Sequence, residues 1–447
     1  MLPAMIIGAG FSGLAAAHAL NKAGKKFIVL EARNRVGGRV FTQPVQDTYY
    51  LDLGGQWIGP GQHRMYELAR EHNLQWFETY NTGKNIIDLN GRIRTYSGLI
   101  PKIDPLSLVN IQWVLTRLES MAKRLPPDKP WTTPRAFTYD GISLDYFLRK
   151  KCFTRNAYQV LRPGLETVYA CNLNELSLLH ALFYIQSGNN LNTLLSIENG
   201  AQQHRIIGGM QQLAERMAAP FRECIHFNHA VTNIVQDDTG VTVSGNNFSY
   251  RASRIIIAIP PVLIRNIHFE PSLPLLRQQL LQKLFMGRVG KVFGIYRTPF
   301  WRKYGFSGQV VTDEQQPFQV FFDSSPADGS YGVLLAFCIA VRAQQFFSLS
   351  QTERKNMALQ HFSRYFGEEA LHPEYYTDHC WADEAWSGGC YAAVYPTGTW
   401  TSFQDELMKP FGNIHWAGTE TSKAWYGYIE GAVRAGERAA AELLSHS

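Results

Sequence analysis

The chain has 447 residues, of which 45% are hydrophobic and 18% are charged, and its formal net charge is +6. This length exceeds what one hydrophobic core supports, so we expect a globular protein with at least two domains. No run of residues approaches the ~18 consecutive apolar positions that a membrane helix requires. The densest basic cluster, residues 149–155, is typical of a solvated helix end rather than of a nucleic-acid site.

The first 24 residues have the pattern of a strand, a glycine-rich turn and a helix. Residues 5–7 are apolar and are predicted to form a strand, and residues 14–23 are predicted to form a helix that Gly24 ends. Between them lies a G-x-G-x-x-G motif, made by Gly8, Gly10 and Gly13. Such glycines permit a tight turn and a close approach of the backbone to a pyrophosphate, which binds at the helix N-terminus.

A second strand is predicted over Phe27–Leu30, and it ends at Glu31. An acidic residue about 20 positions after the glycines accepts hydrogen bonds from ribose hydroxyls. Strand, glycines, helix, strand and acid in this order predict a Rossmann-type dinucleotide-binding unit. FAD and NAD share this unit, so the residues that follow must distinguish them.

Glycine pairs and arginines follow Glu31. The pairs are Gly37 with Gly38 and Gly54 with Gly55, and the arginines are Arg33, Arg35 and Arg39. Glycine pairs suggest a backbone that lies against an extended cofactor, and the arginines suit its diphosphate. This region therefore favours FAD.

The middle of the chain contains two groups of predicted strands, after a proline-rich loop at residues 125–134. Residues 230–235, 240–243 and 254–259 would complete the cofactor sheet, while Val289–Tyr296 and residues 309–311, 318–322 and 333–339 would form a sheet over a substrate pocket. Lys291 falls inside one of these apolar strands, where an unpartnered ammonium is costly. It is either functional or a lysine that snorkels from an edge strand.

The six cysteines form no CxxC pair and show no metal-ligand spacing with histidine, so we expect no metal site. Five of them are predicted to be reduced core thiols: Cys152, Cys171, Cys224, Cys338 and Cys380. His226 and His229 are predicted to be ordinary surface or core histidines. Nothing at the N-terminus resembles a signal peptide, because the cofactor glycines begin at residue 8.

The remaining cysteine, Cys390, lies in the block WSGGCY at residues 386–391, and a second block, AGTETSKAWYGYIEGAVRAGERAA, covers residues 417–440. Two glycines before a cysteine and a tyrosine allow the backbone to pass close to a flat ligand. With the first forty residues, these blocks resemble the flavin-containing amine oxidases, and WSGGCY is most similar to the monoamine oxidases. The likeness runs from residue 5 to about residue 444 and includes residues 254–261 and 285–301.

The resemblance implies an α/β (α+β overall) fold in which a Rossmann-like FAD-binding domain is interleaved with a substrate domain of mixed sheet and helices. The FAD-binding domain would comprise residues 1–79, 205–285 and 391–447, and the substrate domain residues 80–204 and 286–390. Cys390 matches the cysteine that monoamine oxidases join to the flavin 8α carbon. The alternative is a buried thiol beside a non-covalent FAD.

The resemblance also assigns roles to residues. Tyr391 and Tyr428 match the two tyrosines that flank the substrate amine, and Lys291 matches the lysine that holds a water against flavin N5. The residues expected to bind the cofactor are Gly8, Gly10, Ser12, Gly13, Glu31, Arg33, Gly38, Arg39, Gly54, Gly55, Gln56, Trp57, Val231, Cys390, Gly418, Thr419, Glu420 and Ile429. Those expected to line the substrate pocket are Tyr184, Leu195, Glu198, Gln202 and Val311.

The predicted function is FAD-dependent oxidation of an amine to an imine, and then to an aldehyde, with O2 reduced to H2O2. A monoamine is the first choice of substrate. Glu198, which stands where the animal enzymes have threonine, leaves open a polyamine of the spermidine or putrescine type if it faces the cavity, and the alternative is a glutamate that faces solvent. An L-amino-acid oxidase is a further alternative, and a non-catalytic flavin-bearing interaction module belongs to a different class.

The resemblance bears on the cellular context as well. The animal monoamine oxidases continue into a membrane anchor beyond the point that matches Ser447. We therefore expect a soluble, cytoplasmic protein of bacterial type with no membrane anchor and no nucleic-acid partner. The sequence leaves the oligomeric state open, with a homodimer as one option.

Overall fold

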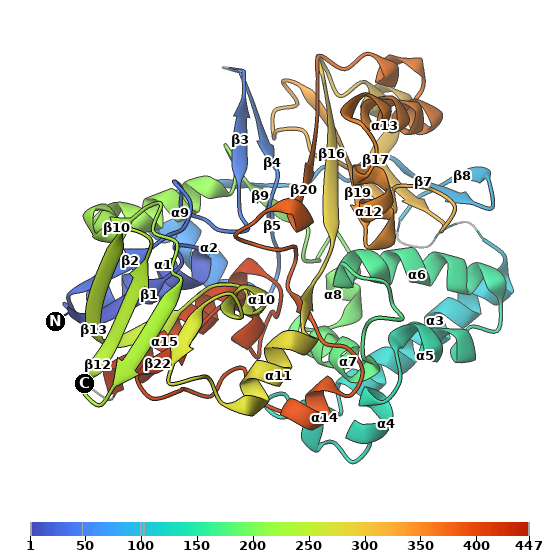
Figure 1. Ribbon diagram of the computed structural model, residues 1–447. Helices are drawn as coiled ribbons and strands as arrows, with labels where there is room; N and C mark the ends of the chain where they lie inside the picture. Colours follow the sequence, from blue (N-terminus) through green and yellow to red (C-terminus); the bar gives the residue numbers. More distant parts are fainter. Residues whose placement is uncertain (1, 47, 99–100, 102, 446–447) are drawn as a thin grey trace.

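The computed structural model describes residues 2–46, 48–98, 101 and 103–445. It contains an eight-stranded sheet, a seven-stranded sheet and a block of helices, which occupy three regions of the molecule (Figure 1). No helix among the described residues combines the length and apolarity needed to cross a bilayer. Nor do three His, Cys, Asp or Glu side chains in this part of the chain gather as metal ligands.

The eight-stranded sheet has the strand order β10-β2-β1-β13-β12-β11-β14, and β22 pairs with β13. Its bounds are β1 (Leu2–Ile7), β2 (Phe27–Leu30), β10 (Ile225–His226), β11 (Asn233–Asp237), β12 (Gly240–Gly245), β13 (Phe248–Ile257), β14 (His268–Glu270) and β22 (Ile414–Trp416). The strands β10, β2, β1, β13 and β22 run parallel. Their carboxyl ends therefore meet at one edge, where open α/β sheets bind ligands.

The predicted strands of this sheet are confirmed, with shifted ends. The strand at Phe27–Leu30 is as predicted, while the one expected at residues 230–235 begins only at Asn233. The strand expected at residues 254–259 instead begins at Phe248 and ends at Ile257. Pro260 has no N–H to continue the ladder, and it lines a cavity together with Val231.

Helix α1 (Phe11–Lys22) packs between this sheet and the C-terminal helix α15 (Ile429–Ser445). Glycines make both contacts possible. A Cβ on Gly13 would lie 1.8 Å from the Gly8 carbonyl oxygen, and one on Gly436 would lie 2.0 Å from the Ser12 carbonyl oxygen. The first helix therefore lies against a strand and against a helix from the opposite end of the chain.

The seven-stranded sheet has the order β20-β16-β19-β18-β17-β7-β8. Its bounds are β7 (Lys84–Leu89), β8 (Arg92–Tyr96), β16 (Val289–Tyr296), β17 (Phe306–Thr312), β18 (Val320–Asp323), β19 (Gly332–Ile339) and β20 (Tyr375–Cys380). All eight residues of β16 and all eight of β19 are buried, so both faces of the sheet are covered. The strand predicted at Val289–Tyr296 is confirmed, whereas β7, β8 and β20 were not predicted.

Helices cover the second sheet and form the block beneath it in Figure 1. The main ones are α3 (Pro105–Ala122), α5 (Leu144–Lys151), α6 (Arg155–Tyr169), α7 (Leu178–Ser187), α8 (Leu191–Leu195), α12 (Val341–Phe347) and α13 (Gln351–Phe366). The basic cluster falls in the last turn of α5, where Arg149 and Lys150 are exposed, as predicted. All six cysteines are free, but Cys152, Cys224 and Cys380 are only partly buried, so the prediction that they are core thiols was wrong.

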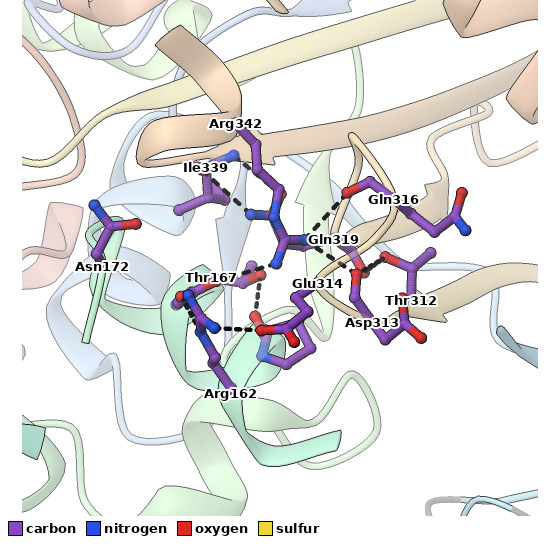
Figure 2. A network of polar contacts seen from close by, with 12 residues as sticks. Arg162, Thr167, Asn172, Thr312, Asp313, Glu314, Gln316, Gln319, Ile339 and Arg342 are labelled. Atoms are coloured by element: carbon purple, nitrogen blue, oxygen red, sulfur yellow. Dashed lines mark hydrogen bonds and ion pairs between the residues drawn. The ribbon is translucent and has the colours of Figure 1, made fainter. Parts of the chain in front are cut away.

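A polar network joins α6 to the turn between β17 and β18 and to α12 (Figure 2). Glu166, 2% exposed, accepts a hydrogen bond from Arg162 Nε at 2.8 Å and one from Arg342 Nη2 at 3.5 Å. Arg342 Nη1 also donates to the carbonyl oxygens of Asp313 and Gln316, both at 3.3 Å. Since a buried carboxylate left without its cations is costly, these contacts fix the helical block on the sheet.

Three small sheets connect the two large ones. One pairs β3 (Thr42–Val45) with β4 (Tyr49–Asp52), another contains β5 (Trp57–Ile58), β6 (Trp76–Glu78) and β9 (His204–Ile206), and the third pairs β15 (Phe285–Met286) with β21 (Ala393–Val394). They hold residues 52–57 and residues 387–394 between the large sheets. These are the segments in which the sequence places glycine pairs.

Candidate active site

A cavity lies at the carboxyl ends of β1 and β2 and encloses about 1280 Å³ of space, part of it open to solvent. Fifteen of the residues assigned from the sequence line it: Gly8, Gly10, Ser12, Glu31, Arg33, Gly38, Arg39, Gly55, Val231, Cys390, Tyr391, Gly418, Thr419, Tyr428 and Ile429. They come from both ends and from the middle of the chain. The fold therefore brings together in one hollow most of the residues that the sequence singled out.

One end of the cavity has the features of a nucleotide site. Gly8 has φ +100°, and a Cβ there would lie 2.9 Å from the Ala258 carbonyl oxygen. Glu31, 4% exposed, accepts hydrogen bonds from the backbone N–H groups of Ala9 at 2.6 Å and Arg33 at 2.9 Å. These bonds hold the carboxylate at the tip of β2, where it can accept from ribose hydroxyls.

The N-terminus of α1 faces the same cavity. Its N-cap residue is Gly10, which offers no side-chain cap, and the first turn has no acidic residue. The unpaired N–H groups and the helix dipole favour an anion at this place. Ser12 Oγ accepts a hydrogen bond from Gly418 N at 2.8 Å, which joins this turn to the C-terminal segment. Together with the Glu31 carboxylate, this anion site fits the diphosphate and ribose of a dinucleotide.

Arg39 and Glu420 form a bidentate ion pair beside the cavity, with Nη1–Oε1 at 2.6 Å and Nη2–Oε2 at 3.1 Å. Arg39 Nη1 also donates to the Tyr391 carbonyl oxygen at 2.7 Å. Burial alone would lower the pKa of Arg39, but the Glu420 carboxylate outweighs it and the pKa is raised. Arg39 lines the cavity and Glu420 does not. Glu420 therefore fixes the position of Arg39 in the cavity wall and is not itself part of that wall.

Cys390 lines the same cavity and follows a glycine pair in which Gly388 has φ +65° and Gly389 has φ +138°. Its backbone N–H donates to the Gly287 carbonyl oxygen at 2.9 Å. The thiol is 5% exposed, and burial raises its pKa to about 12, although Arg39 and Lys291 oppose the shift. In this environment the sulfur is a neutral thiol at pH 7.

The segment before Cys390 is attached to the dinucleotide motif through Arg33. Arg33 Nη2 donates to Ser387 Oγ at 2.8 Å and to Glu384 Oε2 at 3.3 Å, and Nη1 donates to the Trp386 carbonyl oxygen at 3.4 Å. Residues 385–387 line the cavity. Arg33 thus joins the segment after β2 to residues 384–387, which precede Cys390.

Tyr391 and Tyr428 both line the cavity and both are half-buried. Burial raises the pKa of each phenol, so both side chains are neutral. Within the described part of the chain no ring-to-ring contact joins them, and Tyr428 instead lies beside Tyr184, with ring centroids 6.1 Å apart. Two neutral aromatic rings on one cavity, not packed against each other, can flank a small ligand.

Lys291 lies in the fully buried strand β16, next to the segment 52–56. Its Nζ donates to the carbonyl oxygens of Asp52 at 2.9 Å and Gly54 at 2.7 Å, and to Gln56 Oε1 at 2.7 Å. Burial lowers the pKa of Lys291 to about 7, against the opposing charge of Asp52. The alternative of an edge-strand lysine that snorkels to solvent is wrong, because β16 is paired on both sides.

Five residues assigned to cofactor binding lie outside the cavity lining: Glu420, described above, and Gly13, Gly54, Gln56 and Trp57. Gly13 and Gly54 provide close packing: a Cβ on Gly54 would lie 2.3 Å from the Arg39 carbonyl oxygen. Gln56 accepts the hydrogen bond from Lys291, and Trp57 stacks on Phe337 with ring centroids 6.0 Å apart. These residues support the wall that Gly55 forms.

None of the five residues assigned to the substrate pocket is among the described residues that line this cavity. Tyr184 is buried beside Tyr428, Val311 is half-buried, and Gln202 Nε2 donates to the Leu194 carbonyl oxygen at 3.2 Å. Leu195 is 40% exposed and Glu198 is exposed, which agrees with the alternative of a solvent-facing Glu198, and the assignment of both residues to the substrate pocket stays a prediction. Leu195 is the last residue of the short helix α8 and Glu198 lies just after it, with Ser196 and Ile197 at the buried positions between them.

The cavity also contains residues that the sequence did not single out as a site. They are His229, Leu263, Asn266, Trp386 and Ser387. The backbone N–H of His229 donates to the Glu31 carbonyl oxygen at 2.8 Å, which places its ring near the nucleotide end. Two sequence signals could have identified some of these residues. His229 lies two residues before Val231, and Trp386 and Ser387 belong to the WSGGCY block.

Comparison with known proteins places these features in a family. Residues 11–444 match the family model described as flavin containing amine oxidoreductase. AofH of Mycobacterium tuberculosis, assigned as a flavin-containing monoamine oxidase, is 39% identical over 441 residues, which cover 99% of this chain and 96% of that protein. The flavin-containing amine oxidase B of Canis lupus familiaris is 34% identical over 444 residues, 98% of this chain and 85% of that protein.

Solved structures agree along the whole chain. Wild-type putrescine oxidase bound to putrescine superposes with a TM-score of 0.95 at 31% identity, covering 99% of each chain. Cyclohexylamine oxidase from Brevibacterium oxydans IH-35A superposes with a TM-score of 0.94 at 29% identity, covering 100% of this chain and 99% of that chain. The mixed α/β fold is thus shared with oxidases named for a diamine and for a monoamine.

The buried ammonium of Lys291 makes stability depend on pH. Its pKa is about 7 in the folded chain, whereas the ordinary value is 10.5, so above pH 7 the unfolded chain binds a proton that the folded chain lacks. Stability must therefore rise with pH across this range. We predict that the free energy of unfolding of the wild type, relative to Lys291→Met, rises by about 2 kcal/mol between pH 7 and pH 9.

Denaturant unfolding of the two proteins at pH 6, 7, 8 and 9 measures this difference. Tyrosines and cysteines titrate in both proteins, so their contributions cancel in the difference between the two free energies of unfolding. The difference should be nearly flat below pH 7, where Lys291 is protonated in both states. A difference that stays constant up to pH 9 would show that the folded chain keeps Lys291 fully charged.

Proposed function

The chain belongs to the flavin-containing amine oxidoreductases, and from this premise we propose that the cavity between Gly8 and Tyr428 holds FAD for the oxidation of a monoamine. The protein is an FAD-dependent amine oxidase with an amine as substrate and O2 as acceptor. The amine loses two electrons and two protons to give an imine, which water converts to an aldehyde. O2 takes up the electrons and protons and becomes H2O2.

The observation that carries the placement of the cofactor is the arrangement along the cavity. At one end Glu31 can hold ribose hydroxyls, and next to it the uncapped N-terminus of α1 can hold the diphosphate. Cys390 and Tyr391 line the same cavity, and we place the ring system beside them. When bound, FAD supplies the two-electron chemistry, and the protein supplies orientation and electrostatics.

Tyr391 and Tyr428 are proposed to hold the substrate amine. Their neutral rings offer two aromatic faces, which attract a cationic amine by ~0.5–2 kcal/mol and leave an apolar slot for the neutral form. Lys291 is proposed to contribute a positive charge to the reduction of O2. We also propose that the domain boundaries follow the discontinuous division given above, with residues 1–79, 205–285 and 391–447 around the cofactor.

We choose a monoamine because of the number and position of the carboxylates that line the cavity. Glu31 is the only acidic residue among the described residues that line the cavity, and it belongs to the nucleotide end. A diamine or polyamine would bring a second ammonium, which a desolvated carboxylate would have to balance. The second candidate is a diamine of the putrescine type, which the similarity to putrescine oxidase favours.

Covalent attachment of FAD is part of the proposal and rests on Cys390 at the ring end of the cavity. We predict that acid-precipitated wild type stays yellow and that a tryptic peptide containing Cys390 carries the flavin mass. Cys390→Ala should bind FAD, because the nucleotide end is unchanged, but should release all of it on precipitation. If the wild type also releases all its flavin, the link to Cys390 does not exist, although FAD binding stands.

A separate prediction concerns Lys291 and oxygen. Lys291→Met should slow reoxidation of the reduced flavin by about tenfold to a hundredfold, because a buried positive charge favours electron transfer to O2. Anaerobic reduction by the amine should change little. Stopped-flow measurement of the two half-reactions separates these effects, and equal slowing of both would contradict this role.

The substrate prediction uses Glu198. Because its side chain is exposed, Glu198→Gln should leave kcat/KM for both benzylamine and putrescine within about twofold of the wild type. Benzylamine or aliphatic monoamines should lead a panel read out as H2O2 formation. A preference for putrescine that Glu198→Gln abolishes would reverse the assignment in favour of a diamine.

A further inference from the structure

Helix α3 carries apolar side chains on its outer face in its first half. Leu106, Val109 and Trp113 are 60%, 63% and 44% exposed, and their spacing of three and four residues places them on one face. The face turned toward the protein begins instead with Ser107 and Asn110, which are 1% and 0% exposed. An amphipathic surface helix of a globular protein has the opposite arrangement, with its polar residues outside. The three exposed side chains therefore form an apolar stripe on the surface.

The polar residues of the inner face fix the chain that follows α5. Ser107 Oγ donates to Thr154 Oγ1 at 2.8 Å. Asn110 Oδ1 accepts from the backbone N–H groups of Phe153 at 2.8 Å and Thr154 at 3.1 Å. Phe153, which is 61% exposed, is thereby held against the start of α3 and adjoins the stripe. We define the α3 patch as Leu106, Val109, Trp113 and Phe153.

Positive charge is concentrated in the part of the chain that carries this patch. Residues 105–155 contain nine Lys and Arg against four Asp and Glu, a net charge of +5, whereas the whole chain has +6. Eight of the nine cations are exposed and one, Lys151, is half-buried. Of these nine, only Arg149 forms an ion pair within the described part of the chain, with Asp145. The others are available to a negatively charged partner.

Some of these cations border the patch directly. The Arg117 guanidinium carbon lies 5.8 Å from the ring centroid of Trp113. Lys151 and Arg155 lie two residues to either side of Phe153. Figure 1 shows α3 and α5 in the helical block, on the side of the molecule away from the eight-stranded sheet. The apolar side chains and the cations therefore share one surface.

A partner that suits this surface must combine negative charge with an apolar interior. A nucleic acid has the charge but offers no apolar interior to Leu106 or Val109. A second copy would bring the same cations face to face in a symmetric contact, where like charges repel. An anionic lipid bilayer has both properties, because its headgroups attract Lys and Arg and the layer beneath them accommodates Leu, Phe and Trp.

We infer that the α3 patch binds reversibly to the surface of an anionic lipid bilayer. Leu106, Val109 and Phe153 enter the boundary of the acyl chains, Trp113 lies at the level of the headgroups, and the surrounding cations contact the headgroups. This association requires no membrane-spanning helix. None of the four patch residues is among the described residues that line the cavity, so the inference stands apart from the proposed oxidation of an amine.

Sedimentation of the full chain with lipid vesicles tests the inference. Vesicles of phosphatidylcholine with about 30% phosphatidylserine provide the anionic surface, and vesicles of phosphatidylcholine alone are the neutral reference. We expect the wild type to bind the anionic vesicles in about 0.1 M salt and the neutral ones at least about tenfold more weakly. Raising the salt to about 0.5 M should also weaken binding to the anionic vesicles at least about tenfold, because the headgroup charges are then screened.

An apolar variant and its control test the stripe. The variant Leu106→Ser/Val109→Ser/Trp113→Ser removes apolar area at the patch and changes no charge. It should weaken binding to the anionic vesicles about tenfold or more. The control Leu275→Ser/Leu276→Ser replaces side chains that are 67% and 51% exposed on α11 (Leu275–Lys283), and it should stay within about twofold of the wild type.

A charge variant and its control test the cations. The variant Lys150→Gln/Lys151→Gln/Arg155→Gln should weaken binding about a hundredfold, since each Lys or Arg near an anionic surface contributes about fivefold. The control Lys22→Gln/Lys25→Gln/Lys26→Gln removes the same net charge near the end of α1. In both sets two side chains are exposed and one is half-buried. The control should stay within about twofold of the wild type, because its lysines lie outside the patch.

Three results would overturn the inference. A wild type that does not bind the anionic vesicles has no such surface, and a change from dimer to monomer in the apolar variant would then assign the patch to a contact between two copies. Equal losses in the charge variant and its control would show that only net charge matters. Unchanged binding of the apolar variant would show that lipid does not contact the stripe. If this triple variant does not fold by circular dichroism, Trp113→Ser and the charge variant decide the question.

Discussion

The ion pair between Arg39 and Glu420 is the interaction on which the rest of the site depends. It joins residue 39 to residue 420, and the same guanidinium holds the Tyr391 carbonyl oxygen. Glu420 is 4% exposed, so removing either partner would leave a charge in a dry environment. Three segments that are remote in sequence are thereby held together, with Cys390 and Tyr391 at the cavity.

The two large sheets impose a second constraint, which is the burial of β16. Because this strand is paired on both sides and covered on both faces, a lysine in it can be accommodated only by oxygen atoms brought from another segment. Asp52 and Gly54 provide main-chain carbonyls for this purpose. The same contact fixes the glycine pair that forms part of the cavity wall, so the electrostatics of Lys291 and the shape of the wall are inseparable.

The local parts of the fold could be predicted from the sequence, because their signals are local. The first strand, its glycines, α1 and Phe27–Leu30 follow from spacing and apolarity, and β16 follows from an apolar run. The strand β8 could not be predicted in this way: four of its five residues are exposed, and its position comes from pairing with β7 rather than from its own sequence.

The site was predictable where side chains carry the signal, as at Glu31, Arg33 and Cys390. It was not predictable where main-chain atoms do the work. The oxygens that hold Lys291 lie 237 and 239 residues away and leave no trace in the identity of Asp52 or Gly54. The exposure of Leu195 and Glu198 could not be predicted either, because the direction in which side chains point at the end of a five-residue helix and just after it depends on packing, not on composition.

The contact of α1 with α15 has a consequence for biosynthesis. Helix α1 packs along α15, and Ser12 Oγ receives its hydrogen bond from Gly418 N, so contacts of α1 join segments that are translated far apart in time. The surroundings of the dinucleotide motif are therefore complete only after the more than 400 residues that separate Ser12 from Gly418 have been made. Until the residues of α15 have been made, the face of α1 that contacts α15 lacks its partner, and the wall of the cavity that Gly418 and Thr419 form is missing.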